Sequence, residues 1–137
     1  MIKKLAHLCI LSADLQKTED FYCGVLGLKK KFDFIREGRL FGFYLEVSDH
    51  QFIEFFQTTE ATREKGNLLT HLCLEIEDMT EFTKHLEGSG VKFTEPKLGA
   101  DQSWQTWCTD PDGVAIEFHQ YTPASCQHTG HECVVNW

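Results

Sequence analysis

The sequence predicts an α+β protein built from two tandem β-α-β-β-β modules. The first reason is an internal repeat: His7-Leu8-Cys9-Ile10 returns as His71-Leu72-Cys73-Leu74, and Ile53-Glu54-Phe55-Phe56-Gln57 returns as Ile116-Glu117-Phe118-His119-Gln120. The second is that both pairs of copies have nearly the same offset, which is typical of a duplicated module. The third is the order of patterns, because in each copy a strand is followed by a helix and then by three further strands.

The first module is expected to span residues 1–57. Residues Lys4 to Leu11 indicate a buried strand, and Asp14 is expected to cap a helix that ends at Gly27. The apolar residues of that helix recur at helical spacing. Three strands should follow: Lys29 to Ile35, Leu40 to Val47 and His50 to Gln57.

The second module is expected to span residues 70–121, after a polar connection at 58–69 that has room for a short helix. Its predicted elements repeat the order of the first: a strand at Thr70 to Glu77, a helix at Met79 to Glu87, and strands at Lys92 to Thr94, Trp104 to Cys108 and Val114 to Tyr121. Residues 122–137 lie beyond the repeat and are interpreted as a flexible C-terminal extension. Its ligand-type residues lack a common zinc-finger spacing: Cys126, His128, His131 and Cys133.

Composition and charge exclude several classes of protein. The 137 residues are 42% hydrophobic and include 11 Phe, which is enough for a packed core. A net charge of −8 and the lack of a long basic block argue against nucleic acid as a partner. No apolar run is long enough to span a membrane. The apolar start resembles a secretory signal, but it is interrupted by His7 and recurs at position 71, so we interpret it as a strand. The protein is therefore expected in the cytoplasm, where its cysteines should be reduced.

The repeat also predicts a metal site, because each module contributes one His and one Glu: His7 with Glu54, and His71 with Glu117. A carboxylate flanked by Ile and Phe needs a partner to offset its burial, and a metal ion is such a partner. If the modules pair around a pseudo-twofold axis, the four side chains converge on one divalent ion. Two imidazoles and two carboxylates suit Zn, Ni, Co or Mn.

Side chains that alternate along these strands share the face of the predicted ligands. Glu117, for instance, shares its face with Ala115 and His119. The face is expected to bind a small-molecule substrate with apolar surface. Its predicted lining residues are Leu11, Phe52, Phe56, Cys9, Cys73 and Trp107. The two cysteines are interpreted first as small lining residues, with extra metal ligation or redox sensitivity as the alternatives.

Several motifs resemble the glyoxalase I-like branch of the vicinal oxygen chelate superfamily over residues 4 to 121. They are Asp20-Phe21-Tyr22, then Val25-Leu26-Gly27-Leu28, and Asp110-Pro111-Asp112-Gly113 leading into Ile116-Glu117. The resemblance implies a curved, cup-shaped mixed sheet with helices outside. It also implies a homodimer, and in that family the modules are often exchanged between chains. A closed monomer whose modules pair within one chain is the alternative.

By this resemblance, His7, Glu54, His71 and Glu117 fall on the four metal positions of glyoxalase I. The implied activity is that of a metal-dependent lyase or isomerase, similar to lactoylglutathione lyase, that transfers a proton through an enediolate of a vicinal-oxygen substrate. Glu117 is the preferred base and Glu54 the second candidate. Two positions that contact glutathione in that family carry Leu11 and Thr58 here, so we expect poor use of glutathione.

Two other functions remain open within the same superfamily. An extradiol-type dioxygenase would hold Fe(II) with His7, His71 and Glu117, although Glu54 would occupy a position that oxygen or substrate needs. A metal-free drug-binding resistance protein would use the same cup, but it has no need for four ligand-type residues in register.

Overall fold

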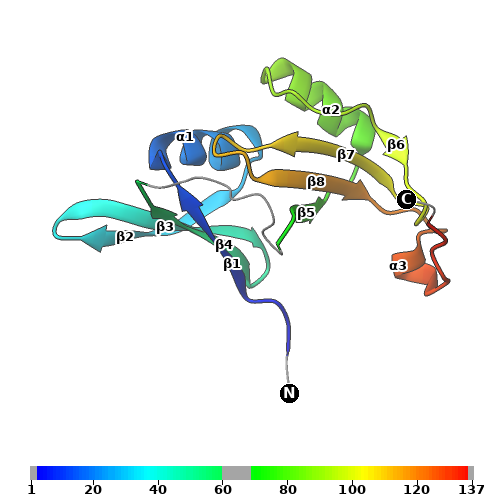
Figure 1. Ribbon diagram of the computed structural model, residues 1–137, viewed down its shortest axis with the longest axis horizontal. Helices are drawn as coiled ribbons and strands as arrows, with labels where there is room; N and C mark the ends of the chain where they lie inside the picture. The colour runs from blue at the N-terminus through cyan, green and yellow to red at the C-terminus, as the bar shows by residue number, and fades with distance from the viewer. Residues whose placement is uncertain (1–2, 60–68, 136–137) are drawn as a thin grey trace. The chain divides into compact units, whose positions relative to one another are not determined.

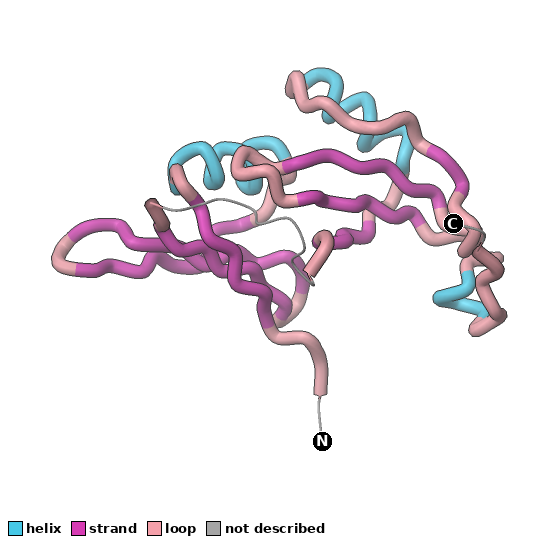
Figure 2. The backbone as a smooth tube through the Cα atoms, viewed as in Figure 1, coloured by secondary structure: helices cyan, strands magenta, loops and turns pink. Residues whose placement is uncertain are grey.

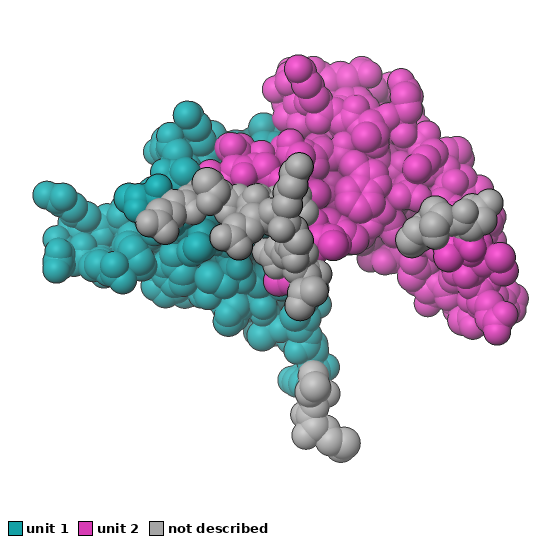
Figure 3. Space-filling model, viewed as in Figure 1, with its two compact units in different colours: residues 1–64 teal, residues 65–137 magenta. Residues whose placement is uncertain are grey.

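The computed structural model describes residues 3–59 and 69–135, which form α+β structure (Figures 1 and 2). The chain divides into two compact units, residues 1–64 and 65–137 (Figure 3). Each unit contains one four-stranded mixed sheet, so the α+β class and the repeated β-α-β-β-β order are confirmed. Most of the connection expected at 58–69, with its short helix, lies outside the described residues.

The first unit follows the predicted order closely. Its elements are β1 (His7–Ser12), α1 (Leu15–Glu19), the π-helix η1 (Asp20–Val25), β2 (Lys29–Arg36), β3 (Arg39–Ser48) and β4 (Gln51–Gln57). The strands lie in the order β1-β4-β3-β2. β1 runs parallel to β4, and the other neighbours are antiparallel. The first and last strands of the module are therefore adjacent.

The helical segment of the first unit covers one face of this sheet. Asp14 caps α1 by accepting a hydrogen bond from the Lys17 backbone N–H, as the sequence predicts. The expected single helix changes to π-helical geometry at Asp20 and ends before Gly27, which has a φ of +74°. Tyr22 and Phe55 are fully buried and pack with tilted rings whose centroids are 4.7 Å apart. This packing leaves the other face of the sheet open for the site.

The second unit repeats the topology with shorter strands. Its elements are β5 (Leu72–Glu75), α2 (Met79–Gly88), β6 (Lys97–Leu98), β7 (Trp104–Thr109), β8 (Ala115–Gln120) and α3 (Cys126–Thr129). The strand order is β5-β8-β7-β6, with β5 parallel to β8. Phe82 of α2 packs on Phe118 of β8, with ring centroids 4.5 Å apart. The helix again covers one face of its sheet.

The prediction of a strand at Lys92 to Thr94 is wrong. Only an isolated bridge between Phe93 and Cys108 forms there, and the edge strand is β6, a few residues later. Pro96 separates the bridge from β6, and because it has no N–H it cannot continue a ladder. The Thr94 side chain also replaces a carbonyl in the ladder, since its Oγ1 accepts the Trp107 N–H at 3.0 Å.

The described part of the C-terminal extension is attached to the second unit, which differs from the flexible extension expected. Ser103 and Ser125 are fully buried, and the Ser103 hydroxyl donates to the Ser125 hydroxyl at 3.0 Å. The Gln127 amide donates to Asp101 at 2.6 Å. Burial would raise the pKa of Asp101, but the hydrogen bonds from Gln127 and Ser103 outweigh it and lower that pKa. These contacts fix α3 beside the loop that precedes β7.

Within residues 3–59 and 69–135, none of the helices has both the length and the apolar character needed to span a membrane.

Candidate metal-binding site

The open face of the first sheet brings together the first predicted ligand pair. In the parallel pairing of β1 with β4, Cys9 lies opposite Glu54, and His7 lies two residues before Cys9. The Nε2 atom of His7 is 3.4 Å from an Oε atom of Glu54. Tyr44 packs edge-on against the His7 imidazole, with ring centroids 5.7 Å apart. The first His–Glu pair is thus held by strand register and by one aromatic ring.

The Cys9 thiol faces the same carboxylate. Burial, followed by a hydrogen bond to Glu54 and the charge of that residue, raises the pKa of Cys9. These surroundings favour the protonated thiol of Cys9.

Aromatic side chains surround this pair on the open face. Phe52 and Phe56, predicted as lining residues, flank Glu54 on β4, and Leu11 continues the face of β1. Tyr44 stacks on Phe32 at 4.8 Å and contacts Phe52 at 5.0 Å, while Phe34 contacts Phe56 at 4.8 Å. The aromatic face of the first unit is defined by these residues: Phe32, Phe34, Tyr44, Phe52 and Phe56. Tyr44 was missed in the sequence, although it occupies the repeat position of the predicted Trp107.

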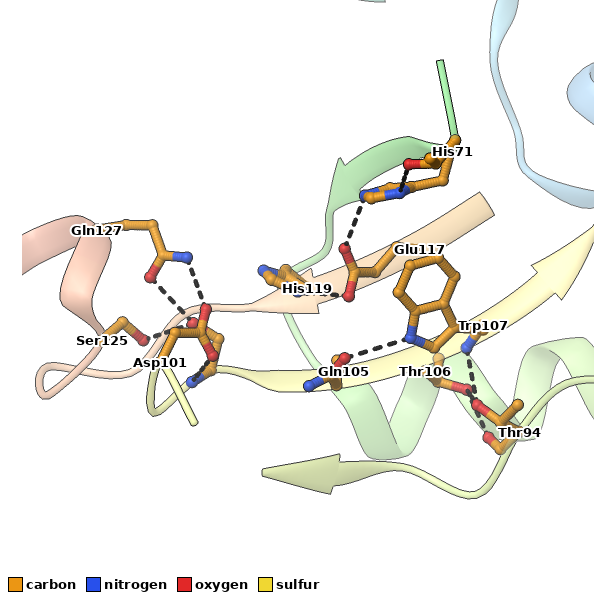
Figure 4. A network of polar contacts seen from close by, with 12 residues as sticks. His71, Thr94, Asp101, Gln105, Thr106, Trp107, Glu117, His119, Ser125 and Gln127 are labelled. Carbon is orange, nitrogen blue, oxygen red and sulfur yellow. Dashed lines mark hydrogen bonds and ion pairs between the residues drawn. The ribbon is translucent and has the colours of Figure 1, made fainter. Parts of the chain in front are cut away.

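The second unit holds its own ligand pair in the same way (Figure 4). The Nε2 atom of His71 is 3.4 Å from Oε2 of Glu117. Trp107 packs edge-on against the His71 imidazole, with ring centroids 4.9 Å apart, and its indole N–H donates to Gln105 at 3.2 Å. The Thr70 hydroxyl lies 2.8 Å from Nδ1 of His71. The same arrangement of imidazole, carboxylate and aromatic ring therefore occurs twice in the chain.

The turn before β8 sets the position of Glu117. Asp110 accepts backbone hydrogen bonds from Asp112 at 2.9 Å and from Val114 at 2.8 Å, and Gly113 adopts a φ of +86°. Such a turn needs a short acceptor side chain at its start and glycine at the position with positive φ. The Asp110-Pro111-Asp112-Gly113 turn predicted from the sequence is confirmed, and Glu117 follows it on β8.

His119 is a site residue that lies outside the repeated His and Glu positions. It lies two residues beyond Glu117, on the same face, and its Nε2 atom is 3.0 Å from Oε1 of Glu117. Figure 4 shows the Glu117 carboxylate between the two imidazoles, with one oxygen toward each ring. Potential ligand atoms of Cys73, Glu117 and His119 all lie within 4.8 Å of one another. Strand alternation from Glu117 is the sequence feature that points to His119.

The geometry of the His–Glu pairs fits adjacent ligands of one ion. Their nitrogen–oxygen distance of 3.4 Å is longer than a charge-assisted hydrogen bond, which is about 2.8 Å. Two ligand atoms bonded to one ion at about 2.1 Å lie about 3.0–3.5 Å apart. Oxygen and nitrogen donors of this kind suit Zn, Ni, Co and Mn. Each pair therefore has the spacing and the chemistry of half a divalent-metal site.

Comparisons with known proteins agree with this reading of the fold. The profile of the Glyoxalase/Bleomycin resistance protein/Dioxygenase superfamily matches residues 4–118. An uncharacterized protein of Escherichia coli K12, YaeR, is 26% identical over 125 residues, covering 87% of this chain and 97% of that protein. A lactoylglutathione lyase of Neisseria meningitidis is 29% identical over 125 residues, covering 85% and 90% of the two chains.

Solved structures with the same fold belong to proteins of several kinds. An integron cassette protein of Vibrio cholerae is 30% identical, with a TM-score of 0.67 and coverage of 89% of this chain and 98% of that one. An antibiotic-binding protein of Streptomyces, TnmS3, has a TM-score of 0.73 at 20% identity, covering 88% and 98%. The fosfomycin resistance protein FosX of Listeria monocytogenes has a TM-score of 0.70 at 18% identity, covering 89% and 96%. The chain belongs to the Glyoxalase/Bleomycin resistance protein/Dioxygenase superfamily.

Proposed function

We propose that this protein is a divalent-metal-dependent lyase or isomerase of the glyoxalase I type. The observation that carries the proposal is the His–Glu pair that recurs in each unit, on the sheet face opposite the helix, with the same 3.4 Å separation. The similarity to a lactoylglutathione lyase supports the same reaction class. The proposed substrate is a small molecule with two vicinal oxygens.

The proposed ligands of one ion are His7 and Glu54 from one module and His71 and Glu117 from another. A divalent ion, when bound, neutralises negative charge that develops on the substrate oxygens. The chain itself supplies the base, because one of the two carboxylates can take the α-proton and return it to the neighbouring carbon. Their surroundings differ, since Glu117 faces two imidazoles and Glu54 faces one.

The two positions expected to contact glutathione support a different thiol or no thiol. Leu11 is 56% exposed on the open face, so an apolar side chain lies at the position of the expected Arg contact. Losing a hydrogen bond between Arg and a carboxylate costs about 1.5–3 kcal/mol, or roughly ten- to a hundredfold in catalytic efficiency. We therefore propose that glutathione hemithioacetals are poor substrates.

We further propose a cytoplasmic homodimer with two equivalent sites. In each unit the helix covers one face of the sheet and the predicted ligands lie on the opposite face, so a single module supplies only half of the proposed four-residue site. Reducing conditions are consistent with the free thiols of all six cysteines. Sedimentation should give twice the single-chain mass of 15.8 kDa at micromolar concentration, and a single-chain mass would contradict the dimer.

The metal assignment is tested by measuring affinity in variants of each ligand. Protein purified without an affinity tag is dialysed with a competing chelator, and its metal content is measured by elemental analysis. We expect His7→Ala, Glu54→Gln, His71→Ala and Glu117→Gln each to lower metal affinity about tenfold or more. Full metal content in both Glu54→Gln and His71→Ala would show that the four-residue assignment is wrong.

The activity is tested with methylglyoxal hemithioacetals of glutathione, a bacillithiol-like thiol and simple thiols, using protein loaded with Zn, Ni, Co or Mn. We expect turnover that depends on the metal and a low efficiency with glutathione. A carboxylate variant that keeps the ion but loses turnover identifies the base. Efficiency with glutathione near the diffusion limit would mean that other residues recognise it. Cleavage of catechols by Fe(II)-loaded protein would instead indicate a dioxygenase.

A second candidate function is the binding of a planar compound without a metal, which the aromatic face of the first unit favours. Aromatic rings stack on flat ligands by offset and edge-on contacts. Fluorescence titration of the protein with planar aromatic antibiotics, with and without a chelator, separates the two functions. Tight binding that is unchanged by the chelator, together with no turnover, would favour the binding protein.

A further inference from the structure

The two units differ at one position beside the repeated Glu. Phe56 follows Glu54 by two residues in β4, and the corresponding residue in β8 is His119. Because side chains alternate along a strand, each of these residues lies on the same sheet face as its Glu. Only the imidazole can donate a hydrogen bond to a carboxylate. The two repeated carboxylates therefore have different neighbours.

His119 contacts one oxygen of Glu117 and leaves the other toward His71. Its Nε2 atom is 3.0 Å from Oε1 of Glu117, which is within hydrogen-bond distance. Oε2 is the oxygen that lies 3.4 Å from Nε2 of His71, the separation expected of two ligands of one ion. Figure 4 shows the carboxylate between the two rings. One oxygen of Glu117 thus has a partner within the protein, and the other has the spacing of a metal ligand.

The His119 ring is itself held in place by the fold. It is 9% exposed and belongs to β8, which lies between β5 and β7 in the sheet. Its ring packs edge-on against Tyr121, with centroids 5.8 Å apart, and Tyr121 packs against His128 of α3 at 5.3 Å. The C-terminal extension therefore supports the ring from behind. A donor that is fixed in this way restrains the carboxylate that accepts its hydrogen bond.

Glu54 lacks this restraint in the described part of the chain. Phe56, at the position of His119, has no donor group. The cysteine on the adjacent strand does not distinguish the two carboxylates, because Cys9 hydrogen-bonds to Glu54 and Cys73 hydrogen-bonds to Glu117. The contact with a buried imidazole that also leaves one oxygen toward the metal ligand His is therefore particular to the second unit.

We propose that His119 is a positioning residue that keeps Glu117 on the metal through Oε2, so that Glu54 is the carboxylate that moves and acts as the base. This inference rests on the proposed function for the ion and the substrate. Glu117 can approach a substrate carbon only by giving up its hydrogen bond to His119, whereas Glu54 has no such bond to lose. The order is the reverse of the sequence-based prediction, in which Glu117 is the preferred base.

The proposed step moves one proton between adjacent carbons of the substrate. Glu54 takes the proton as the C–H bond breaks, and the electron pair forms a C=C bond and displaces a pair onto the carbonyl oxygen. The carboxyl group then returns the proton to the second carbon, while the hydroxyl proton moves from the first oxygen to the second. The product is an isomer of the substrate, so no other reactant is consumed.

The role of His119 is tested through metal affinity, without any substrate. Full-length protein is titrated with Co²⁺ in competition with a chelator, and circular dichroism checks that each variant is folded. His119→Phe inserts the residue that the first unit has at Phe56, and we expect it to lower Co²⁺ affinity about tenfold. His119→Gln is the matched control, because its amide nitrogen can replace Nε2 as the donor. We expect affinity close to the original in this variant.

A double-mutant cycle separates positioning from a general packing role. We expect His119→Phe to lower Co²⁺ affinity when Glu54 is replaced by Ala, but to have no further effect when Glu117 is replaced by Ala. The same loss in both backgrounds would overturn the proposal, as would equal losses in His119→Phe and His119→Gln.

The base is identified from turnover at saturating Co²⁺, with the methylglyoxal hemithioacetal of a simple thiol as substrate. We expect Glu54→Gln to lower kcat about a hundredfold or more with little change in KM. Glu117→Gln should need more Co²⁺ but keep most of its turnover once the site is filled. The opposite order would show that Glu117 is the base.

The outcomes distinguish this inference from the proposed function. Turnover that depends on the metal, without the expected affinity pattern at His119, would leave the proposed function standing and overturn the inference. The expected affinity pattern without turnover of any hemithioacetal would overturn the reaction class and the base assignment, and the positioning of Glu117 by His119 would stand. Absence of Co²⁺ binding would overturn both.

Discussion

Among single residues, Cys108 shows how the core changes the chemistry of a thiol. It is 5% exposed on the core face of β7, and burial, followed by the charge of Asp110, raises its pKa to about 11. The folded state therefore favours the protonated thiol. Because the pKa of an exposed thiol is lower, the unfolded chain loses this proton first as the pH rises.

We predict that Cys108 makes the protein less stable between pH 9 and pH 11. Its contribution is fully present below the unfolded pKa and is lost as the pH rises through the folded pKa of about 11. Urea unfolding at several pH values, for the original protein and Cys108→Ala, measures the difference. Identical pH dependence in both proteins would contradict the prediction.

The sequence did not predict His119 as a site residue, and the reason lies in the repeat itself. The repeat selects residues that both modules share, which is how it identified His7, Glu54, His71 and Glu117. A residue that faces the site in only one copy breaks the repeat, and so it looks like ordinary variation between the copies. Its burial and its unpartnered nitrogen are properties of three-dimensional packing, which one sequence does not contain.

At the scale of strands, Gly42 permits the close approach of β3 and β4. A Cβ atom at this position would meet the Phe55 carbonyl oxygen and would lie 2.7 Å from the Phe56 ring. Backbone atoms in a sheet ladder cannot move aside without breaking hydrogen bonds. The corresponding position in the second unit holds Gln105, so the requirement for glycine is local to the first sheet.

We predict that Gly42→Ala lowers the free energy of unfolding by about 1–3 kcal/mol, because overpacking displaces β4. Gly24→Ala in η1 is the matched control, since a Cβ atom there meets nothing within 4 Å. That control should change stability by no more than about 1 kcal/mol. Thermal unfolding of the two variants checks the comparison, and equal stability would contradict it.

The elements that the sequence predicted best are those with strong local causes. The strand β4 and the turn at Asp110 follow from alternation and turn chemistry. The edge strand β6 was misplaced because Pro96 divides a short segment, and whether pairing occurs before or after it depends on the partner strand. The contacts of residues 122–129 depend on Ser103, which is distant in sequence and buried only by the fold.

At the scale of the whole molecule, the two modules allow a test of whether each site combines residues from two chains. In the proposed exchanged dimer, each site takes His7 and Glu54 from one chain and His71 and Glu117 from the other. A mixed dimer of His7→Ala and His71→Ala chains then has one site with both lesions and one site with none.

We predict that mixing these two inactive variants restores activity, to about a quarter of the original level if subunits exchange at random. The reason is that half of the dimers are mixed and one of their two sites is intact. Turnover after a cycle of dilution and reconcentration is the measurement. No recovery, although mass spectrometry detects mixed dimers, would show that each site comes from one chain.

The parallel pairing of β1 with β4, and of β5 with β8, has a further consequence for folding. Each His–Glu pair joins the start of its module to the last strand, segments that are far apart in the unfolded chain. Bringing such segments together costs loop-closure entropy. An ion held by such a pair acts as a reversible cross-link between the two ends of the module. In the proposed metal-bound protein, the free energy of metal binding adds to the free energy of unfolding, so removal of the ion with a chelator should make the protein easier to unfold.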